Sequence, residues 1–148
     1  MSSLRRHRVL LVEDQPTNQL ISTKILEKIG CQVELAVNGL EAVEKVRETP
    51  FDAIFMDCQM PEMDGIDATL EIRRWELSRS PGKAPRPVPI IAVTAGAANA
   101  SREECLEAGM NDYLLKPIRV SEFVGALARW CGRHSAVPFA PESSERST

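Results

Sequence analysis

The sequence predicts an α/β domain of the doubly wound class, in which helices cover both faces of a five-stranded parallel sheet. Short runs of branched apolar residues alternate with longer amphipathic segments, and the strongest runs lack the polar alternation of a half-exposed strand. These strongest runs span residues 8–13, 52–57 and 88–94, and weaker ones span 31–36 and 112–115. Strands that alternate with helices favour right-handed crossovers and therefore parallel pairing.

Five helices are expected in the segments that follow the strands. The first begins at Pro16, which a first helical turn tolerates, and stops at Gly30, while the second begins near Asn38 and ends at Thr49. The others are expected over about 64–77, about 97–108 and from about 120 onward. Four helices show apolar residues at helical spacing: Ile21, Ile25 and Ile29; Leu40, Val43 and Val46; Ile66, Leu70 and Leu77; Val120, Val124, Leu127 and Cys131.

The length and composition are those of one globular domain. The 148 residues are 43% apolar and 26% charged with a formal net charge of −3, which indicates neither a nucleic-acid surface nor a membrane surface. The domain is expected over 8–132, between a flexible N-terminus at 1–7 and a disordered tail at 133–148. A proline-rich segment at 78–89 is expected to be an exposed loop insertion.

Cysteine usage indicates a reducing compartment. The four cysteines are widely spaced, form no Cys-x-x-Cys pair and lie among apolar residues. They are therefore expected to be packing thiols of a cytoplasmic protein rather than disulfides or zinc ligands.

Polar side chains stand where the predicted strands end. The first run ends in Glu13 and Asp14, the third in Asp57 and the fourth in Thr94, and Lys116 follows the fifth. In an open parallel sheet these carboxyl ends share one edge, where ligands bind at the point of strand-order reversal. One crevice is therefore expected to hold three carboxylates, a hydroxyl and an ammonium.

Such a group of residues suits metal-assisted phosphoryl transfer. Three neighbouring carboxylates repel one another unless a cation compensates them, and oxygen ligands favour Mg²⁺, or Mn²⁺, over Zn²⁺. Asp57 is the candidate nucleophile, with the cation held by Glu13 and Asp14, and Lys116 and Thr94 placed to bind the other oxygens of the phosphoryl group.

Each of these residues alone has a more ordinary explanation. Glu13 and Asp14 would form a solvated turn with Asp14 as a helix cap, Thr94 would be a packing residue and Lys116 a surface charge. Their joint occurrence at strand ends on one sheet edge favours function.

Four segments together resemble the response-regulator receiver domain of two-component signalling. They are Leu-Val-Glu-Asp at 11–14, Met-Asp-Cys-Gln-Met-Pro-Glu-Met-Asp-Gly at 56–65, Ala-Val-Thr-Ala at 92–95 and Asp-Tyr-Leu-Leu-Lys-Pro at 112–117. The resemblance covers about residues 8–130. It implies a flavodoxin-like sheet of order 2-1-3-4-5.

The resemblance also assigns roles within the crevice. Asp57 would be the phosphoacceptor, and the metal would be bound by Glu13, Asp14, Asp57 and the backbone carbonyl of Gln59. Lys116 would pair with the phosphoryl group, Thr94 would be the switch hydroxyl and Tyr113 would be the switch aromatic. The peptide bond before Pro117 would be cis, which X-Pro bonds allow at about 0.5 to 1 kcal/mol.

Residues 56–61, together with Asn18 after Pro16, are most similar to receivers of hybrid sensor histidine kinases. The phosphodonor would then be a phosphohistidine on a kinase or on a histidine phosphotransfer domain. The output partner, which is unknown, would contact the face formed by the fourth helix, fifth strand and fifth helix. The chain would be a regulatory domain, not an enzyme beyond its own phosphorylation and slow autodephosphorylation, and either stands alone or is part of a larger protein.

Two features depart from the family pattern. The 78–89 loop is longer than usual, which affects the neighbouring partner surface rather than the site. Gly96 occupies a position that, with Gln59, influences the phosphoryl lifetime in the family, so the lifetime is left open.

Two other functions remain open from the sequence. One is a Mg²⁺-dependent phosphatase with an aspartyl nucleophile, although haloacid-dehalogenase-like enzymes place that nucleophile after the first strand rather than the third. The other is a pseudo-receiver that docks partners without being phosphorylated, which the complete set of site residues disfavours.

Overall fold

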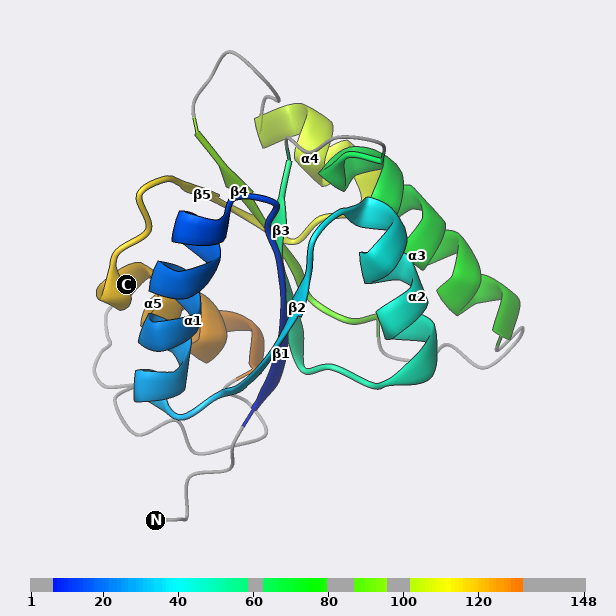
Figure 1. Ribbon diagram of the computed structural model, residues 1–148. Coiled ribbons are helices and arrows are strands. Elements are labelled where there is room, and N and C mark those ends of the chain that lie inside the picture. The colour runs from blue at the N-terminus through cyan, green and yellow to red at the C-terminus, as the bar shows by residue number, and fades with distance from the viewer. Residues whose placement is uncertain (1–6, 59–62, 80–86, 96–101, 132–148) are drawn as a thin grey trace.

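A five-stranded parallel sheet forms the centre of the molecule (Figure 1). The computed structural model describes residues 7–58, 63–79, 87–95 and 102–131. The strands are β1 (Arg8–Val12), β2 (Gln32–Ala36), β3 (Ala53–Asp57), β4 (Ile90–Thr94) and β5 (Asp112–Leu115). They pair in parallel in the order β2-β1-β3-β4-β5, which confirms the predicted doubly wound topology.

Five helices cover the two faces of the sheet. They are α1 (Pro16–Ile29), α2 (Gly39–Glu48), α3 (Gly65–Arg79), α4 (Arg102–Ala108) and α5 (Val120–Cys131). Figure 1 shows α1 and α5 on one face and α2, α3 and α4 on the other. The predicted helix over 97–108 is described from residue 102 onward, and the rest of it lies outside the described residues.

Each face of the sheet has its own hydrophobic cluster because side chains alternate along a strand. On β3, Ile54 and Met56 belong to the cluster under α2, α3 and α4, whereas Phe55 belongs to the cluster under α1 and α5. All five residues of β3 are buried, and so are all five of β4. Phe55 meets Phe123 of α5 edge to face with ring centroids 5.0 Å apart. The central strands are therefore buried on both faces, as their uninterrupted apolar sequences predict.

The buried face of α3 differs from the apolar stripe seen in the sequence, and that of α1 differs from its stripe at Ile21. On α3, Leu70 and Leu77 are 43% and 74% exposed, and the buried residues are Gly65, Ala68, Thr69 and Ile72. These four also have helical i, i+3, i+4, i+7 spacing, and the small size of Gly65 and Ala68 allows α3 to approach the sheet closely. On α1, Leu26 is buried and the predicted Ile25 and Ile29 pack, partly buried, against the same cluster, while Ile21 is 52% exposed. The helices are confirmed, but the leucine stripe does not define the packing face of α3.

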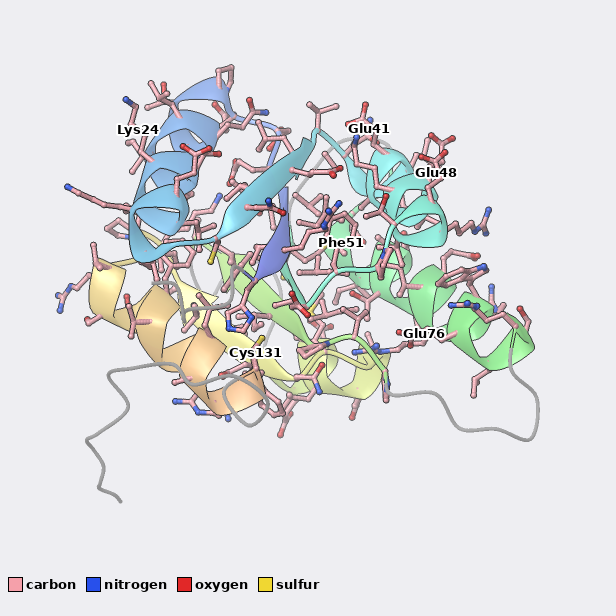
Figure 2. All side chains as sticks on the ribbon, turned by 90° about the horizontal axis from the view of Figure 1, so that it is seen from below. Lys24, Glu41, Glu48, Phe51, Glu76 and Cys131 are labelled. Carbon is pink, nitrogen blue, oxygen red and sulfur yellow. The ribbon has the colours of Figure 1, made fainter. Side chains whose placement is uncertain are left out.

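Glu76, near the C-terminal end of α3, holds the far end of the proline-rich segment against this helix. The Val88 backbone N–H donates to Glu76 Oε2 at 2.9 Å, and Arg73 Nη1 donates to Glu76 Oε1 at 2.9 Å. Figure 2 shows Glu76 on the outer helix α3, viewed from the side of the molecule that lies at the bottom of Figure 1. Residues 80–86 of the expected insertion lie outside the described residues. Both described ends of this segment are therefore fixed to α3.

None of the four cysteines forms a disulfide and all four are buried, in agreement with their predicted role as packing thiols. Cys131, labelled in Figure 2, ends α5 and donates from Sγ to the backbone carbonyl of Asp52 at 3.3 Å. Desolvation, together with the negative charge of Asp52, raises the pKa of Cys31 to about 11 and that of Cys131 to about 12. Both thiols therefore remain protonated at neutral pH.

These thiols predict a loss of stability in alkali. Because their folded pKa values are raised, their contribution is complete below the unfolded thiol pKa near 8.5 and declines as pH rises toward about 11 and 12. The free energy of unfolding should therefore fall above about pH 9, by at most about 1.4 kcal/mol per pH unit for each thiol. Urea unfolding at pH 7.5, 9 and 10.5 measures this fall. The Cys31→Ala/Cys131→Ala variant should show a smaller fall, and an equal fall would contradict the prediction.

Candidate functional site

Five of the predicted site residues lie at the carboxyl ends of the strands: Glu13 and Asp14 follow β1, Asp57 ends β3, Thr94 ends β4 and Lys116 follows β5. Backbone hydrogen bonds continue the sheet pairing past the strand ends. Glu13 N donates to Ala36 O at 3.0 Å, and Lys116 N donates to Thr94 O at 2.8 Å. The sheet therefore holds these residues in register with their neighbours, so that their side chains meet above the same edge.

Three carboxylates converge at this edge. Glu13, Asp14 and Asp57 each offer an oxygen, and these oxygens lie within 4.8 Å of one another. Glu13 and Asp57 are each only 3% exposed, while Asp14 is half-buried. Among the described residues this is the one group of three or more potential metal ligands with that spacing.

Lys116 bridges two of these carboxylates. Its Nζ lies 3.1 Å from Glu13 Oε1 and 3.2 Å from Asp57 Oδ2. Burial of the ammonium alone would lower its pKa, but the negative charges of Asp57 and Glu13 and their hydrogen bonds outweigh burial and raise the pKa of Lys116. The ammonium is therefore charged at neutral pH and partly neutralises the acidic cluster.

Thr94 and Tyr113 lie on β4 and β5, respectively. Thr94 ends β4 and is fully buried. Tyr113, on β5 and paired in register with Ala92, is half-buried and packs against the cluster under α2, α3 and α4. The Lys116–Pro117 peptide bond is cis, the isomer that the sequence resemblance implies. Gln59 and Gly96 lie outside the described residues.

The carboxylate of Glu13 is held by groups whose roles sequence reasoning missed. Glu13 Oε2 accepts hydrogen bonds from the backbone N–H of Gln15 at 3.1 Å and from Asn18 Nδ2 at 3.4 Å. Gln19 Nε2 donates to the backbone carbonyl of Glu13 at 2.7 Å. Asn18 contributed to the family resemblance, but the sequence gives no sign of this contact.

The ordinary explanation of Asp14 as a helix cap is wrong. Gln15 occupies the N-cap position of α1 and makes no side-chain capping hydrogen bond. The anion beside this helix start is instead Glu13, through its bond to the Gln15 N–H, a position that the helix dipole favours. Asp14 is therefore available to the acidic cluster.

Gly65 is a second residue that sequence reasoning left without a role. It begins α3 directly against the end of β3, and a Cβ atom there would lie 2.5 Å from the backbone oxygen of Asp57 and 3.0 Å from Cys58 Cα. Only glycine permits this close approach. The Asp-Gly pair that ends the 56–65 segment was the available signal, but its meaning depends on a contact across the loop.

The donor set fits a hard divalent cation. Glu13, Asp14 and Asp57 supply carboxylate oxygens only, the ligands that Mg²⁺ and Mn²⁺ prefer. The single ammonium of Lys116 does not balance three carboxylates, so the cluster keeps excess negative charge.

No described helix is both long enough and apolar enough to cross a membrane.

Comparison with known proteins identifies relatives of this arrangement. The family model of the response regulator receiver domain matches residues 9–128. Hybrid signal transduction histidine kinase B of Dictyostelium discoideum is 45% identical over 121 residues, which cover 79% of this chain and 6% of the kinase. The chain thus spans only a small part of that relative.

Two solved structures share the fold. The receiver domain of sensor histidine kinase PA1611 from Pseudomonas aeruginosa PAO1, with a magnesium ion coordinated in the active site cleft, is 44% identical with a TM-score of 0.74, covering 86% of this chain and 99% of that one. The receiver domain of Ssk1 from Saccharomyces cerevisiae, solved with the histidine phosphotransfer protein Ypd1, is 34% identical with a TM-score of 0.80, covering 92% and 96%.

Proposed function

Because the chain belongs to the response regulator receiver domain family of two-component and phosphorelay signalling, we propose that Asp57 is its phosphoacceptor. The observation that carries this assignment is the geometry around Asp57. Its buried carboxylate lies within 4.8 Å of two further carboxylates, and the Lys116 ammonium reaches it at 3.2 Å. A nucleophile, a cation site and a fixed positive charge therefore meet at one point.

The proposed reaction transfers a phosphoryl group from the imidazole of a phosphohistidine. A bond forms between a carboxylate oxygen of Asp57 and phosphorus as the phosphorus–nitrogen bond breaks, and the product is an acyl phosphate. Bound Mg²⁺, or Mn²⁺ in its place, would supply positive charge to the phosphoryl oxygens, held by Glu13, Asp14, Asp57 and the backbone carbonyl of Gln59. Lys116 is already placed beside the acceptor oxygen to stabilise the same charge.

Phosphorylation is proposed to move the face formed by α4, β5 and α5. The added charge lies beside Thr94 and Lys116, so it draws the hydroxyl inward and lets Tyr113 turn toward the space that this leaves. To convert a 1:99 population into 99:1, the phosphoryl contacts must favour the active form by roughly 5.5 kcal/mol. A smaller difference would leave the switch partly active in both states.

The relatives support the proposed partners. The P. aeruginosa neighbour holds magnesium in its cleft, and the Ssk1 receiver is bound to a histidine phosphotransfer protein. This chain is accordingly proposed to receive its phosphoryl group from such a protein or from a histidine kinase, as a regulatory domain of a hybrid kinase or as a separate regulator. A cytoplasmic location agrees with its four buried thiols, none of which forms a disulfide. Autodephosphorylation is the one further reaction proposed.

The direct test is incubation with acetyl phosphate and Mg²⁺ followed by intact mass measurement. Wild type should gain the mass of one phosphoryl group, and Asp57→Asn should gain none because its amide cannot act as the nucleophile. Asp67→Asn, an exposed aspartate on α3, is the matched control and should be labelled like wild type.

Each other outcome supports a different function. Labelling that survives Asp57→Asn would contradict the acceptor assignment. Continuous multiple turnover of small phosphate esters would favour a phosphatase. Absence of both labelling and Mg²⁺ binding in wild type would favour a pseudo-receiver.

A further inference from the structure

Asn18 lies in the first turn of α1, where the proposed phosphoacceptor chemistry gives it no role. Its side chain is half-buried, and its Nδ2 approaches Glu13 Oε2 at 3.4 Å. The same oxygen accepts the backbone N–H of Gln15 at 3.1 Å. One edge of the Glu13 carboxylate is therefore engaged entirely by the start of α1.

The other edge of the same carboxylate faces Lys116. Glu13 Oε1 lies 3.1 Å from Lys116 Nζ, which in turn lies 3.2 Å from Asp57 Oδ2. The orientation of Glu13 therefore affects both the negative charge presented to a cation and the place of the ammonium beside Asp57. Rotation of the carboxylate would change both together.

We propose that Asn18 is a positioning residue for the metal site, because its amide fixes the rotation of the Glu13 carboxylate. Glu13 is 3% exposed, so bulk water has little access to its carboxylate to replace a lost donor. Gln19, one residue further along α1, fixes the backbone of Glu13 by donating to its carbonyl at 2.7 Å. The first turn of α1 thus holds Glu13 from two sides.

Hydrogen-bond partners of metal ligands commonly set the affinity of the site, and their removal lowers metal affinity by roughly 10- to 100-fold. Asn18→Ala is therefore expected to raise the Kd for Mg²⁺ by roughly 10-fold, since the Gln15 N–H is retained. Asn18→Leu preserves the side-chain volume without the amide and should give the same loss. Thr17→Ala, an exposed neighbour in the same helical turn, is the control and should leave Kd unchanged.

The decisive experiment is a double-mutant cycle on the full chain, with Kd for Mg²⁺ measured by calorimetric titration. In a Glu13→Gln background, Asn18→Ala should change Kd by less than about 2-fold, because the carboxylate through which it acts is gone. Urea unfolding in EDTA gives the stability of each metal-free variant separately. If Asn18 had only a structural role, Asn18→Ala would lower the metal-free stability, and its effect on the Kd for Mg²⁺ would be the same with and without the Glu13 carboxylate.

An unchanged Kd in both Asn18 variants would overturn the proposal, as would a loss of affinity that persists undiminished in the Glu13→Gln background. The inference rests on the proposed function only in requiring that the acidic cluster binds Mg²⁺. Failure of wild type to be phosphorylated, with Mg²⁺ titration intact, would count against the phosphoacceptor assignment and leave Asn18 as proposed.

Discussion

Gly65→Ala is expected to lower the free energy of unfolding by about 1 to 3 kcal/mol and to impair phosphorylation of Asp57 beyond that loss of stability. The added Cβ would lie 2.5 Å from the Asp57 backbone oxygen, 3.0 Å from Cys58 Cα and 3.0 Å from Met56 Cγ. Two of these three atoms belong to the backbone and cannot turn aside. Relief therefore requires α3 to move away from β3 or the end of β3 to shift.

Either movement would displace Asp57, the proposed phosphoacceptor. Asp57 ends β3, and its Oδ2 is 3.2 Å from Lys116 Nζ, so a displacement of a few tenths of an ångström already changes a contact that the site needs. Urea unfolding measures the stability, and labelling by acetyl phosphate at a temperature where both proteins are folded measures the site.

Gly125→Ala is the matched control for this prediction. Gly125 lies inside α5, and a Cβ there would meet no atom within 4 Å apart from its chain neighbours and the backbone of its own helix. Because alanine favours a helix over glycine by up to about 1 kcal/mol, this variant should be as stable as wild type or more stable, with normal labelling. If both alanine variants had the stability and labelling of wild type, neither property would depend on the close approach of α3 to β3, and the prediction would be contradicted.

The strands and their order illustrate what sequence patterns can predict. β3 and β4 are apolar on both faces up to their last residues, Asp57 and Thr94, because helices cover both faces, so the pattern follows directly from burial. The packing face of α3 is different. Its buried line contains Gly65 and Ala68, which are too small to stand out against Leu70 and Leu77, so hydrophobicity alone selects the wrong face.

The candidate site also has a part that the sequence predicts and a part that it does not. The convergence of Glu13, Asp57 and Lys116 follows from topology, because parallel strands place their carboxyl ends on one edge. The contacts of Asn18 and Gly65 do not follow from any local pattern. They depend on how closely α1 and α3 approach the strand ends, a distance that is set by packing across the whole sheet.

Asp14→Asn is expected to stabilise the metal-free protein and to destabilise it relative to wild type when Mg²⁺ is present. The cluster holds three carboxylates beside one ammonium. Removal of one negative charge relieves repulsion worth roughly 1 kcal/mol, the scale of a charge pair a few ångströms apart in water-like surroundings. The same change removes a carboxylate from the proposed cation site, with an expected loss of Mg²⁺ affinity of about 100-fold or more, since removal of a mere hydrogen-bond partner of a metal ligand already costs roughly 10- to 100-fold.

These two effects reverse the order of stability of the two proteins as the Mg²⁺ concentration rises. At a Mg²⁺ concentration about 100 times the wild-type Kd, wild type gains about 2.7 kcal/mol, whereas a variant that binds 100-fold more weakly gains about 0.4 kcal/mol. Urea unfolding in EDTA and in MgCl₂ should therefore rank the two proteins in opposite orders. Glu44→Gln removes a charge from the exposed side of α2 and should gain from Mg²⁺ as wild type does. If Asp14→Asn also gained as much as wild type, the cation would be held without Asp14, and the cluster of Glu13, Asp14 and Asp57 would not be the metal site.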